Sequence, residues 1–290
     1  MSDLKPNVSD PKPIVPVGGG VVPCPPFVGL DPNLAVKSFF EDPDWVFKTA
    51  IGGVMNATSM VLLFLSRESP IVIPLVFSLW AINTGFVLKT VRERIEVPNG
   101  RLPNWNDWPD LFVSGMSWLA VMTGYLILLV TFIATDFLVA SVISYIKSVP
   151  ILFTLWMSGS IILIVTISFL FNLLLVATMA NFAQEESMNS AFSFIKVLKR
   201  ISKRPGDFFS AWMLGLGIQF LSFAVPCATI VGVFFLPSTV FAGQLIAASL
   251  VAQAWKSSAL AGTEPAGPKT IENNKEEPPQ KEPSKEKPKS

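Results

Sequence analysis

The sequence predicts an all-α, polytopic membrane protein with about six transmembrane helices arranged in three hairpins. Of its 290 residues, 51% are hydrophobic and only 15% are charged, whereas a soluble domain carries about 25% charged residues. The apolar residues form long blocks that short polar turns separate. A block of about 20 apolar residues is long enough to cross the ~30 Å hydrocarbon core as a helix.

The two ends of the chain are predicted to be disordered tails, residues 1–33 and 257–290, and residues 34–256 to be the membrane domain. The first tail holds eight prolines, and the second is rich in Pro, Glu and Lys. Such segments bury too little apolar surface to offset the entropy lost on ordering. The first tail also lacks the basic start, apolar centre and cleavage site of a signal peptide, so we expect the first span to direct insertion.

The first four predicted spans are separated by polar turns that contain proline. They are, in order, about Val46–Leu65, Ile71–Leu88, Leu111–Ala134 and Ile151–Ala180. Asp136 is expected to end the third span at the far interface. Residues 137–147 then either lie along that interface or extend the span. The fourth span is so long that it must tilt or protrude.

The last two predicted spans share one nearly uncharged block, Phe208–Trp255, with a turn near Pro226–Thr229. Two pairs of small residues, Gly243/Ala247 and Ala248/Ala252, would let the last helix pack closely on a neighbour. Five amide side chains fall within the spans: Asn56, Asn83, Asn172, Gln219 and Gln244. They either hold helices together by hydrogen bonds or line a path for a solute.

The polar stretch Asn99–Gly115 lies between the second and third spans and is predicted to be an interfacial elbow. Asn-Gly favours a turn, and tryptophans are expected at headgroup depth with their N–H groups in water. Asp107 is placed to cap the next helix. The elbow is either an anchored loop or a surface for a lipid headgroup or partner protein. Its interfacial motif is Gly100, Leu102, Pro103, Trp105, Asp107 and Trp108.

Residues Met188–Lys203 are predicted to form one amphipathic helix. Its apolar stripe is Ala191, Phe194, Ile195, Leu198 and Ile201, and its basic residues are Lys196, Lys199, Arg200 and Lys203. A basic amphipathic helix beside a span usually lies in the membrane interface, where anionic lipid attracts it. The alternative is that it packs onto another cytoplasmic segment.

The distribution of basic residues predicts the orientation. With six spans, all but two of the 22 Lys and Arg residues fall on one side, and only Arg67 and Lys147 fall on the other. Because basic residues favour the cytoplasmic side, we expect both tails and the polar segments before the three hairpins, the elbow among them, to be cytoplasmic. The expected location is the inner (plasma) membrane of a prokaryote.

The elbow resembles the signature of a membrane family, domain of unknown function 4013. The resemblance rests on Leu-Pro-x-Trp-x-Asp from Leu102 to Asp107, with Gly100 before it and Phe112 and Gly115 after it. Upstream, Gly85-Phe86 and Arg92 or Arg94 fit the first part of the signature, although Phe86 stands where a tyrosine is usual. The resemblance extends over about Phe39 to Trp255. It implies a polytopic prokaryotic membrane protein whose activity is open.

The composition favours a protein that is not an enzyme. There is no histidine, the commonest general base, and no phosphate loop or serine elbow. We expect no cofactor, no metal and, at a net charge of +1, no nucleic acid. The predicted partners are the bilayer, with anionic headgroups, and a second copy or another membrane protein. The leading function is a membrane scaffold or assembly factor; the alternative is a transporter or lipid-handling protein for a neutral or amphiphilic substrate.

Overall fold

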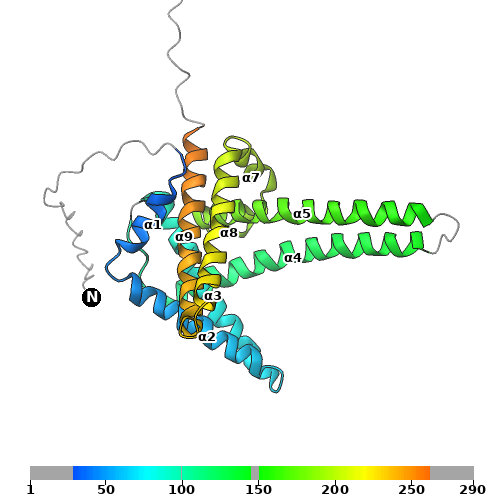
Figure 1. The fold of residues 1–290 in the computed structure, drawn as a ribbon. Helices are drawn as coiled ribbons and strands as arrows, with labels where there is room; N and C mark the ends of the chain where they lie inside the picture. Colours follow the sequence, from blue (N-terminus) through cyan, green and yellow to red (C-terminus); the bar gives the residue numbers. More distant parts are fainter. Residues whose placement is uncertain (1–28, 99, 145–149, 262–290) are drawn as a thin grey trace, which may run out of the picture.

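The computed structural model describes residues 29–98, 100–144 and 150–261, and these residues contain helices but no strand. The long helices form three antiparallel pairs (Figure 1): α2 (Trp45–Leu65) with α3 (Ile73–Glu96), α4 (Trp108–Ser144) with α5 (Pro150–Glu185), and α8 (Pro205–Cys227) with α9 (Gly232–Leu260). Each of the six is long and apolar enough to cross a membrane. The predicted fold class is confirmed.

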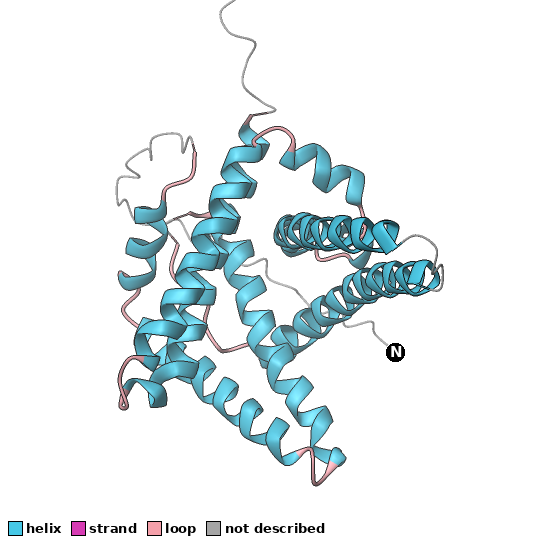
Figure 2. Cartoon of the chain, turned by 45° about the vertical axis from the view of Figure 1, so that its right-hand side comes forward, coloured by secondary structure: helices cyan, strands magenta, loops and turns pink. Residues whose placement is uncertain are grey.

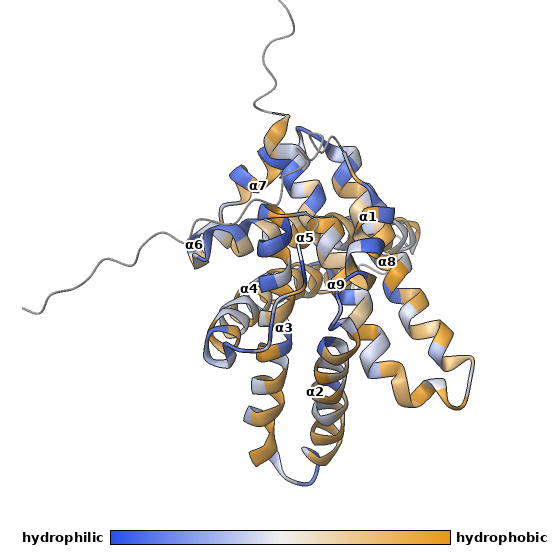
Figure 3. Ribbon diagram, turned by 90° about the vertical axis from the view of Figure 1, so that its left-hand side faces the viewer, coloured by the Kyte–Doolittle hydropathy of each residue, from blue (hydrophilic) through white to orange (hydrophobic). Residues whose placement is uncertain are grey.

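The shorter helices lie around one end of these pairs. They are α1 (Pro32–Phe40), α6 (Met188–Ala191) and α7 (Phe194–Ile201), while the short 3-10 helix η1 (Pro70–Val72) joins α2 to α3. Figure 3 shows hydrophilic residues gathered near α1, α6 and α7, whereas the hairpins are largely hydrophobic. Figure 1 and Figure 2 show that the α4–α5 pair extends to one side of the other two pairs. We name the end with α1, α6 and α7 the elbow end.

Helix α9 is the centre of the packing. It contacts α1, α2, α3, α5, α7 and α8, and 39% of its most apolar segment is buried within the chain. Phe241 and Trp255 are among its fully buried side chains. By contrast, only 6% of the apolar segment of α4 and 11% of that of α5 are buried. The α4–α5 hairpin therefore stands apart from the rest of the bundle.

Two glycines allow α3 and α4 to cross at backbone contact. A Cβ atom at Gly85 would collide with the carbonyl oxygen of Leu111, and one at Gly115 would collide with that of Ala81. Helices approach this closely only where small residues face each other. The predicted close packing of α9 is also present, because Gly243 lies against Ser222 of α8 and Ala248 and Ala252 are buried.

The turn between the last two spans lies at residues 228–231, which agrees with the prediction. Asp136 does not end a helix. Instead, α4 continues to Ser144, and the carboxylate of Asp136 accepts a hydrogen bond from Ser160 of α5, so the polar side chain has a partner inside the hairpin. Helices α1 and α9 extend a few residues into the predicted tails, at Pro32 and Leu260. The remaining tail residues lie outside the described ranges.

Candidate functional site

A buried ion pair holds the elbow against the start of the first span. The side chains of Asp42 and Lys48 are almost fully buried, and Lys48 Nζ lies 3.0 Å from Asp42 Oδ2. Asp42 Oδ2 also accepts the backbone N–H of Leu102 at 2.7 Å, and Lys48 Nζ donates to the carbonyl oxygen of Leu102 at 2.8 Å. Both backbone polar groups of Leu102 are thus satisfied by one ion pair. We call these three residues the clamp.

The clamp keeps Asp42 ionised. Burial raises the pKa of the Asp42 carboxyl, but hydrogen bonds from Lys48 and from the backbone N–H groups of Asp44 and Leu102 more than offset this effect. The pKa of Asp42 therefore lies below its ordinary value. A buried charge is tolerated when it is paired and its hydrogen bonds are complete, as they are here.

Trp105 is the second anchor of the elbow, and its expected position was wrong. Instead of lying with its N–H group in water, the side chain is 7% exposed and stacks on Phe86 with ring centroids 4.0 Å apart. Its Nε1 donates to the carbonyl oxygen of Lys48 at 3.1 Å. The stacking of Phe86 on Trp105 needs only an aromatic face.

Arg94 joins the elbow to α1. Its guanidinium is buried and donates to the carbonyl oxygens of Pro98, at 2.9 Å, and Ser38, at 3.2 Å. Gly100 closes the turn that follows, because its N–H donates to the carbonyl oxygen of Val97 at 2.9 Å. The elbow is therefore bound to α1, to the start of α2 and to the end of α3.

The remaining residues of the interfacial motif divide by exposure. Leu102 and Pro103 are buried with Trp105, whereas Asp107 and Trp108 are exposed. Asp107 precedes the first residue of α4, as expected for a cap, and the hydrogen bond recorded for its carboxylate goes to Lys89 of α3 at 3.3 Å. The first three residues form the buried part of the elbow, and the last two form its surface.

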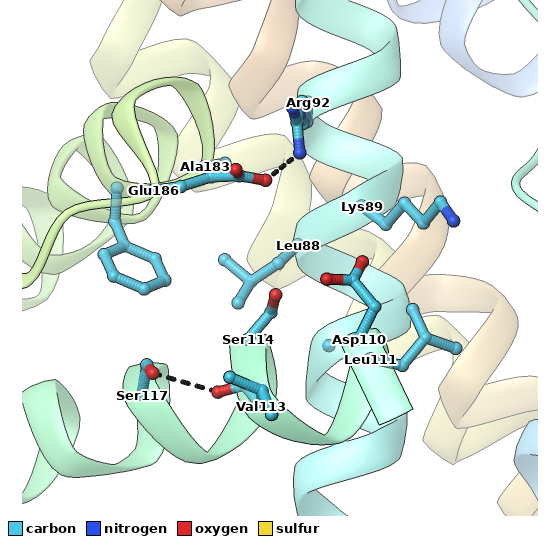
Figure 4. Close-up of a pocket in the computed structure, with 12 residues that line it drawn as sticks. Leu88, Lys89, Arg92, Asp110, Leu111, Val113, Ser114, Ser117, Ala183 and Glu186 are labelled. Atoms are coloured by element: carbon cyan, nitrogen blue, oxygen red, sulfur yellow. Dashed lines mark hydrogen bonds and ion pairs between the residues drawn. The ribbon is translucent and has the colours of Figure 1, made fainter. Parts of the chain in front are cut away.

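A cleft of about 210 Å³ lies between α3, α4 and the end of α5 (Figure 4). Arg92 on one wall forms an ion pair with Glu186, which has a left-handed backbone conformation, φ 49°, directly after α5. Glycine is the usual residue at such a position. Lys89 and Asp110 also line the cleft. The two acidic side chains balance the two basic ones, so the cleft has no excess positive charge that would attract an anion. It is a junction between three helices.

The predicted amphipathic helix is two helices, because α6 ends at Ala191 and α7 begins at Phe194. Arg200 was predicted to face lipid, but its guanidinium lies 4.0 Å from the ring centroid of Trp255 and donates to Gln184 Oε1 at 3.1 Å. Trp255 Nε1 donates to the same oxygen at 2.7 Å. A cation over an aromatic face is attracted by the negative charge density of the ring. Arg200 therefore fixes α7 onto α5 and α9.

The other basic residues of α7, and Lys203 just after it, lie on the surface. Lys196 forms an ion pair with Glu185, while Lys199 and Lys203 are exposed. The predicted apolar stripe is divided as well: Ala191 and Ile201 are buried in the bundle, and Ile195 and Leu198 are 85% and 62% exposed. One half of the stripe thus packs on the protein, and the other half faces outward beside two free lysines.

The amide groups in the spans differ in what they bind. Asn83 Nδ2 donates to Asn56 Oδ1 at 2.7 Å and to the carbonyl oxygen of Gly52 at 3.1 Å, which joins α3 to α2. Asn172 Nδ2 donates to Ser168 of its own helix at 3.0 Å. The expected linking of helices by amides is therefore present at Asn83.

Sequence reasoning missed most of the residues that pair over long separations, namely Asp42, Lys48, Gln184 and Trp255, and it named Arg94 only as part of the family resemblance. One signal was available, because a lysine three residues inside an apolar span is costly unless it has a partner. Asp42 stands six residues before it. Within the described ranges, no three His, Cys, Asp or Glu side chains lie together in a way that could hold a metal ion.

The fold and the elbow define an integral membrane protein of three helical hairpins. The chain belongs to the family described as protein of unknown function (DUF4013), whose sequence model matches residues 70–234, more than half of the chain. No curated protein and no solved structure matches it. The matched range contains the elbow and the α3–α4 crossing, while the ion-paired Asp42 and Lys48 precede it.

Proposed function

We propose that the protein is a non-enzymatic membrane scaffold or assembly factor, and that its α4–α5 hairpin holds a partner membrane protein. The observation that carries this proposal is the apolar tip of that hairpin. Phe137, Leu138, Val142, Ile151 and Leu155 are 58–73% exposed. Side chains of this kind need either lipid or protein around them.

The length of the hairpin argues for protein at the tip. Ser160 lies 25 residues before the end of α5 at Glu185, a rise of about 38 Å. A helix tilted by 40°, the upper end of the usual range, crosses the ~30 Å core in about 39 Å. The hydrogen bond between Asp136 and Ser160 therefore lies at the far boundary, and the apolar tip extends beyond the reach of lipid tails.

The elbow end supplies the rigid base that a scaffold needs. The clamp and the stacked Trp105 fix the elbow to the start of α2, and the Arg92–Glu186 ion pair fixes the end of α3 to the end of α5. The basic residues of α3 and α7 lie at this end, so the positive-inside rule supports a cytoplasmic elbow end with both tails on the same side. The proposed location is the inner membrane of a prokaryote.

A photo-crosslinking residue placed at Leu138 tests the scaffold function in intact cells. Val61, 59% exposed on α2, is the matched control, because it lies within the lipid-covered part of a span. We expect Leu138 to give one protein adduct in near-stoichiometric yield, lost in a Phe137→Ser variant, and Val61 to give lipid adducts. Absence of any protein adduct at Leu138 contradicts the proposal. If Leu138 forms an adduct only with a second copy of this protein, the hairpin tip mediates self-assembly and does not hold a different partner protein.

A second candidate function is transport or handling of a neutral or amphiphilic molecule. The observation that favours it is a polar pocket among the spans, lined by Asn56 and Gln244. Substrate sites of transporters lie near the bilayer midplane, between helical units. Flux and lipid-scrambling assays in proteoliposomes test this function directly. Activity in these assays would favour transport or lipid handling over the scaffold function.

A further inference from the structure

A pocket of about 360 Å³ lies between α2, α3, α4 and α9. Four polar residues line it, Asn56, Asn83, Thr84 and Gln244, and it has no charged lining residue. Asn56, Asn83 and Gln244 stand 10–12 residues after the starts of their helices, a rise of about 15–18 Å. The pocket is therefore at about half the depth of the hydrocarbon core.

The hydrogen-bonding capacity of this pocket is not used within the chain. Hydroxyl groups in the spans commonly donate to their own helix, as Thr90 does to Phe86 and Thr123 to Leu119. No hydrogen bond is recorded for the Thr84 hydroxyl or the Gln244 amide among the described residues, and Asn56 Nδ2 has none either. At this depth water does not replace the missing partners, and each unsatisfied group costs free energy.

Asn83 is an independent indication that something is missing. Its side chain is 5% exposed, and its Oδ1 is buried without a hydrogen-bond partner. The orientation of the amide is fixed, because Nδ2 donates to the carbonyl oxygen of Gly52. Oδ1 is therefore an acceptor that requires a donor.

The apolar surroundings of the pocket indicate the rest of the ligand. Leu119 and Met122 of α4 line this pocket and also a second one, of about 280 Å³, between α4 and α5. The second pocket is mostly apolar, with Leu126, Leu129 and Leu175 among its lining residues. The two pockets therefore adjoin at Leu119 and Met122, so apolar side chains lie beside the polar group that the first pocket would hold.

We infer that the pocket between α2, α3, α4 and α9 binds an uncharged, hydroxyl-bearing group, and that an acylglycerol-type lipid supplies it. Hydroxyl groups both donate and accept, which matches the free donor of Asn56, the free acceptor of Asn83 and the two-sided groups of Thr84 and Gln244. The absence of a charged lining residue favours this group over a phosphate or an amine. The inference does not depend on the scaffold function, whose evidence lies at the hairpin tip.

Thermal unfolding of the full chain in detergent, titrated with monooleoylglycerol, tests the inference. The informative variants are Thr84→Val and Gln244→Leu, because neither removes a hydrogen bond within the chain. We expect monooleoylglycerol to raise the unfolding temperature of the unchanged protein. Each variant should bind it about five to ten times more weakly, the loss of one or two hydrogen bonds. Ser117→Ala, in the cleft of Figure 4, is the control and should bind normally.

Two further probes test which part of monooleoylglycerol is recognised, its hydroxyl groups or its hydrocarbon chain. Oleic acid has the same chain with a carboxyl head, and equal protection by oleic acid would overturn the inference, because the head group would not be recognised. Equal protection by free glycerol would show that the pocket recognises hydroxyl groups, but it would overturn the inference that a lipid supplies them. No protection by any probe, or equal protection of the Thr84→Val and Gln244→Leu variants, overturns the inference.

Discussion

Asp42 accepts a hydrogen bond from the backbone N–H of Leu102, 60 residues further along the chain, at 2.7 Å. The same carboxylate pairs with Lys48, which donates to the carbonyl oxygen of Leu102. The backbone N–H and the carbonyl oxygen of Leu102, which would otherwise be buried without partners, are thus both satisfied. The start of the second hairpin is fixed to the start of the first by charge-assisted hydrogen bonds, which are stronger than neutral ones.

Replacing Asp42 by Ala should destabilise the protein strongly. Lys48 would be left as a buried, unpaired charge and the Leu102 N–H as an unsatisfied donor, at a cost of about 3–5 kcal/mol. Thermal or denaturant unfolding in detergent measures the change. The matched control is Lys37→Ala, which removes an exposed ion pair with Glu41 and should cost less than ~1 kcal/mol. Similar losses in the two variants would contradict the role of the clamp.

The clamp also predicts how stability depends on pH. Because the pKa of Asp42 is lowered in the folded protein, its contribution is complete above the ordinary value of 3.8. It is lost as the pH falls below 3.8 through the folded value. We expect Asp42→Asn to show a smaller loss of stability than the unchanged protein between pH 5 and acid conditions, on the order of 1 kcal/mol per pKa unit. If the unchanged protein and the Asp42→Asn variant lose stability in parallel as the pH falls, Asp42 is not the titrating group.

The crossing of α3 and α4 makes Gly85 and Gly115 sensitive to a single methyl group. Gly85→Ala or Gly115→Ala places a Cβ atom against a backbone carbonyl of the other helix, which no side-chain rotation relieves. We expect a loss of about 1–3 kcal/mol, as for other overpacked sites, in detergent unfolding. Gly217→Ala on α8 is the control, since nothing lies within 4 Å of its Cβ position; it should be neutral or stabilising.

The basic residues of α7 should separate into two functions. Arg200→Gln removes the contact with Trp255 and the hydrogen bond to Gln184, so α7 should open more often. A cation–π contact of about 1–2 kcal/mol corresponds to hydrogen exchange about five to thirty times faster in α7. Lys199→Gln, an exposed position, should leave the exchange unchanged.

Lipid binding, by contrast, should depend on the exposed lysines of α7 and of the turn after it. Changing Lys199 and Lys203 to Gln should weaken association of the purified protein with anionic vesicles by ~1 kcal/mol per lysine. Lys196→Gln, whose charge is paired with Glu185, should have a smaller effect. Vesicle flotation at low salt measures the difference. Equal effects of all three changes would show that the ion pair does not hold in the membrane.

The hairpin turns should be accessible from outside the cell. Cys227 is exposed at the end of α8, and a membrane-impermeant maleimide should label it in intact cells once Cys24 is replaced. Cysteine at Ser69, before η1, should behave in the same way, whereas cysteine at Ser202, after α7, should react only after permeabilisation. Labelling of Ser202 from outside would reverse the proposed orientation.

The elements of the fold were predictable because each depends on local composition. The hairpins, the turn after Pro226 and the small residues of α9 all follow from patterns within 20 to 30 residues. The extent of α4 was open, since an aspartate near a membrane boundary either ends a helix or finds a partner. The partner of Asp136 is Ser160, on the next helix, and no local pattern reveals it.

The candidate site was harder to predict because its contacts join distant residues. Tryptophan beside a span is usually an interfacial anchor, so Trp105 was placed in the headgroups, although Phe86 and the Lys48 carbonyl bury it. Leu102, Pro103 and Trp105 of the motif are buried, but the pattern around them did not predict their partners Asp42 and Lys48. Likewise, the position of Arg200 depends on Trp255, 55 residues later, which the periodicity of its own helix does not report.

The long separation within the clamp has a consequence for biosynthesis. Lys48 leaves the ribosome 54 residues before Leu102, which at 5–20 residues per second is a delay of about 3 to 11 s. During that interval Asp42 alone can neutralise the lysine while the α2–α3 hairpin enters the bilayer. When Leu102 is synthesised, its N–H and its carbonyl oxygen complete the set of hydrogen bonds and join the two ends of the inserted hairpin. Insertion of the first hairpin therefore becomes hard to reverse before the second hairpin is made.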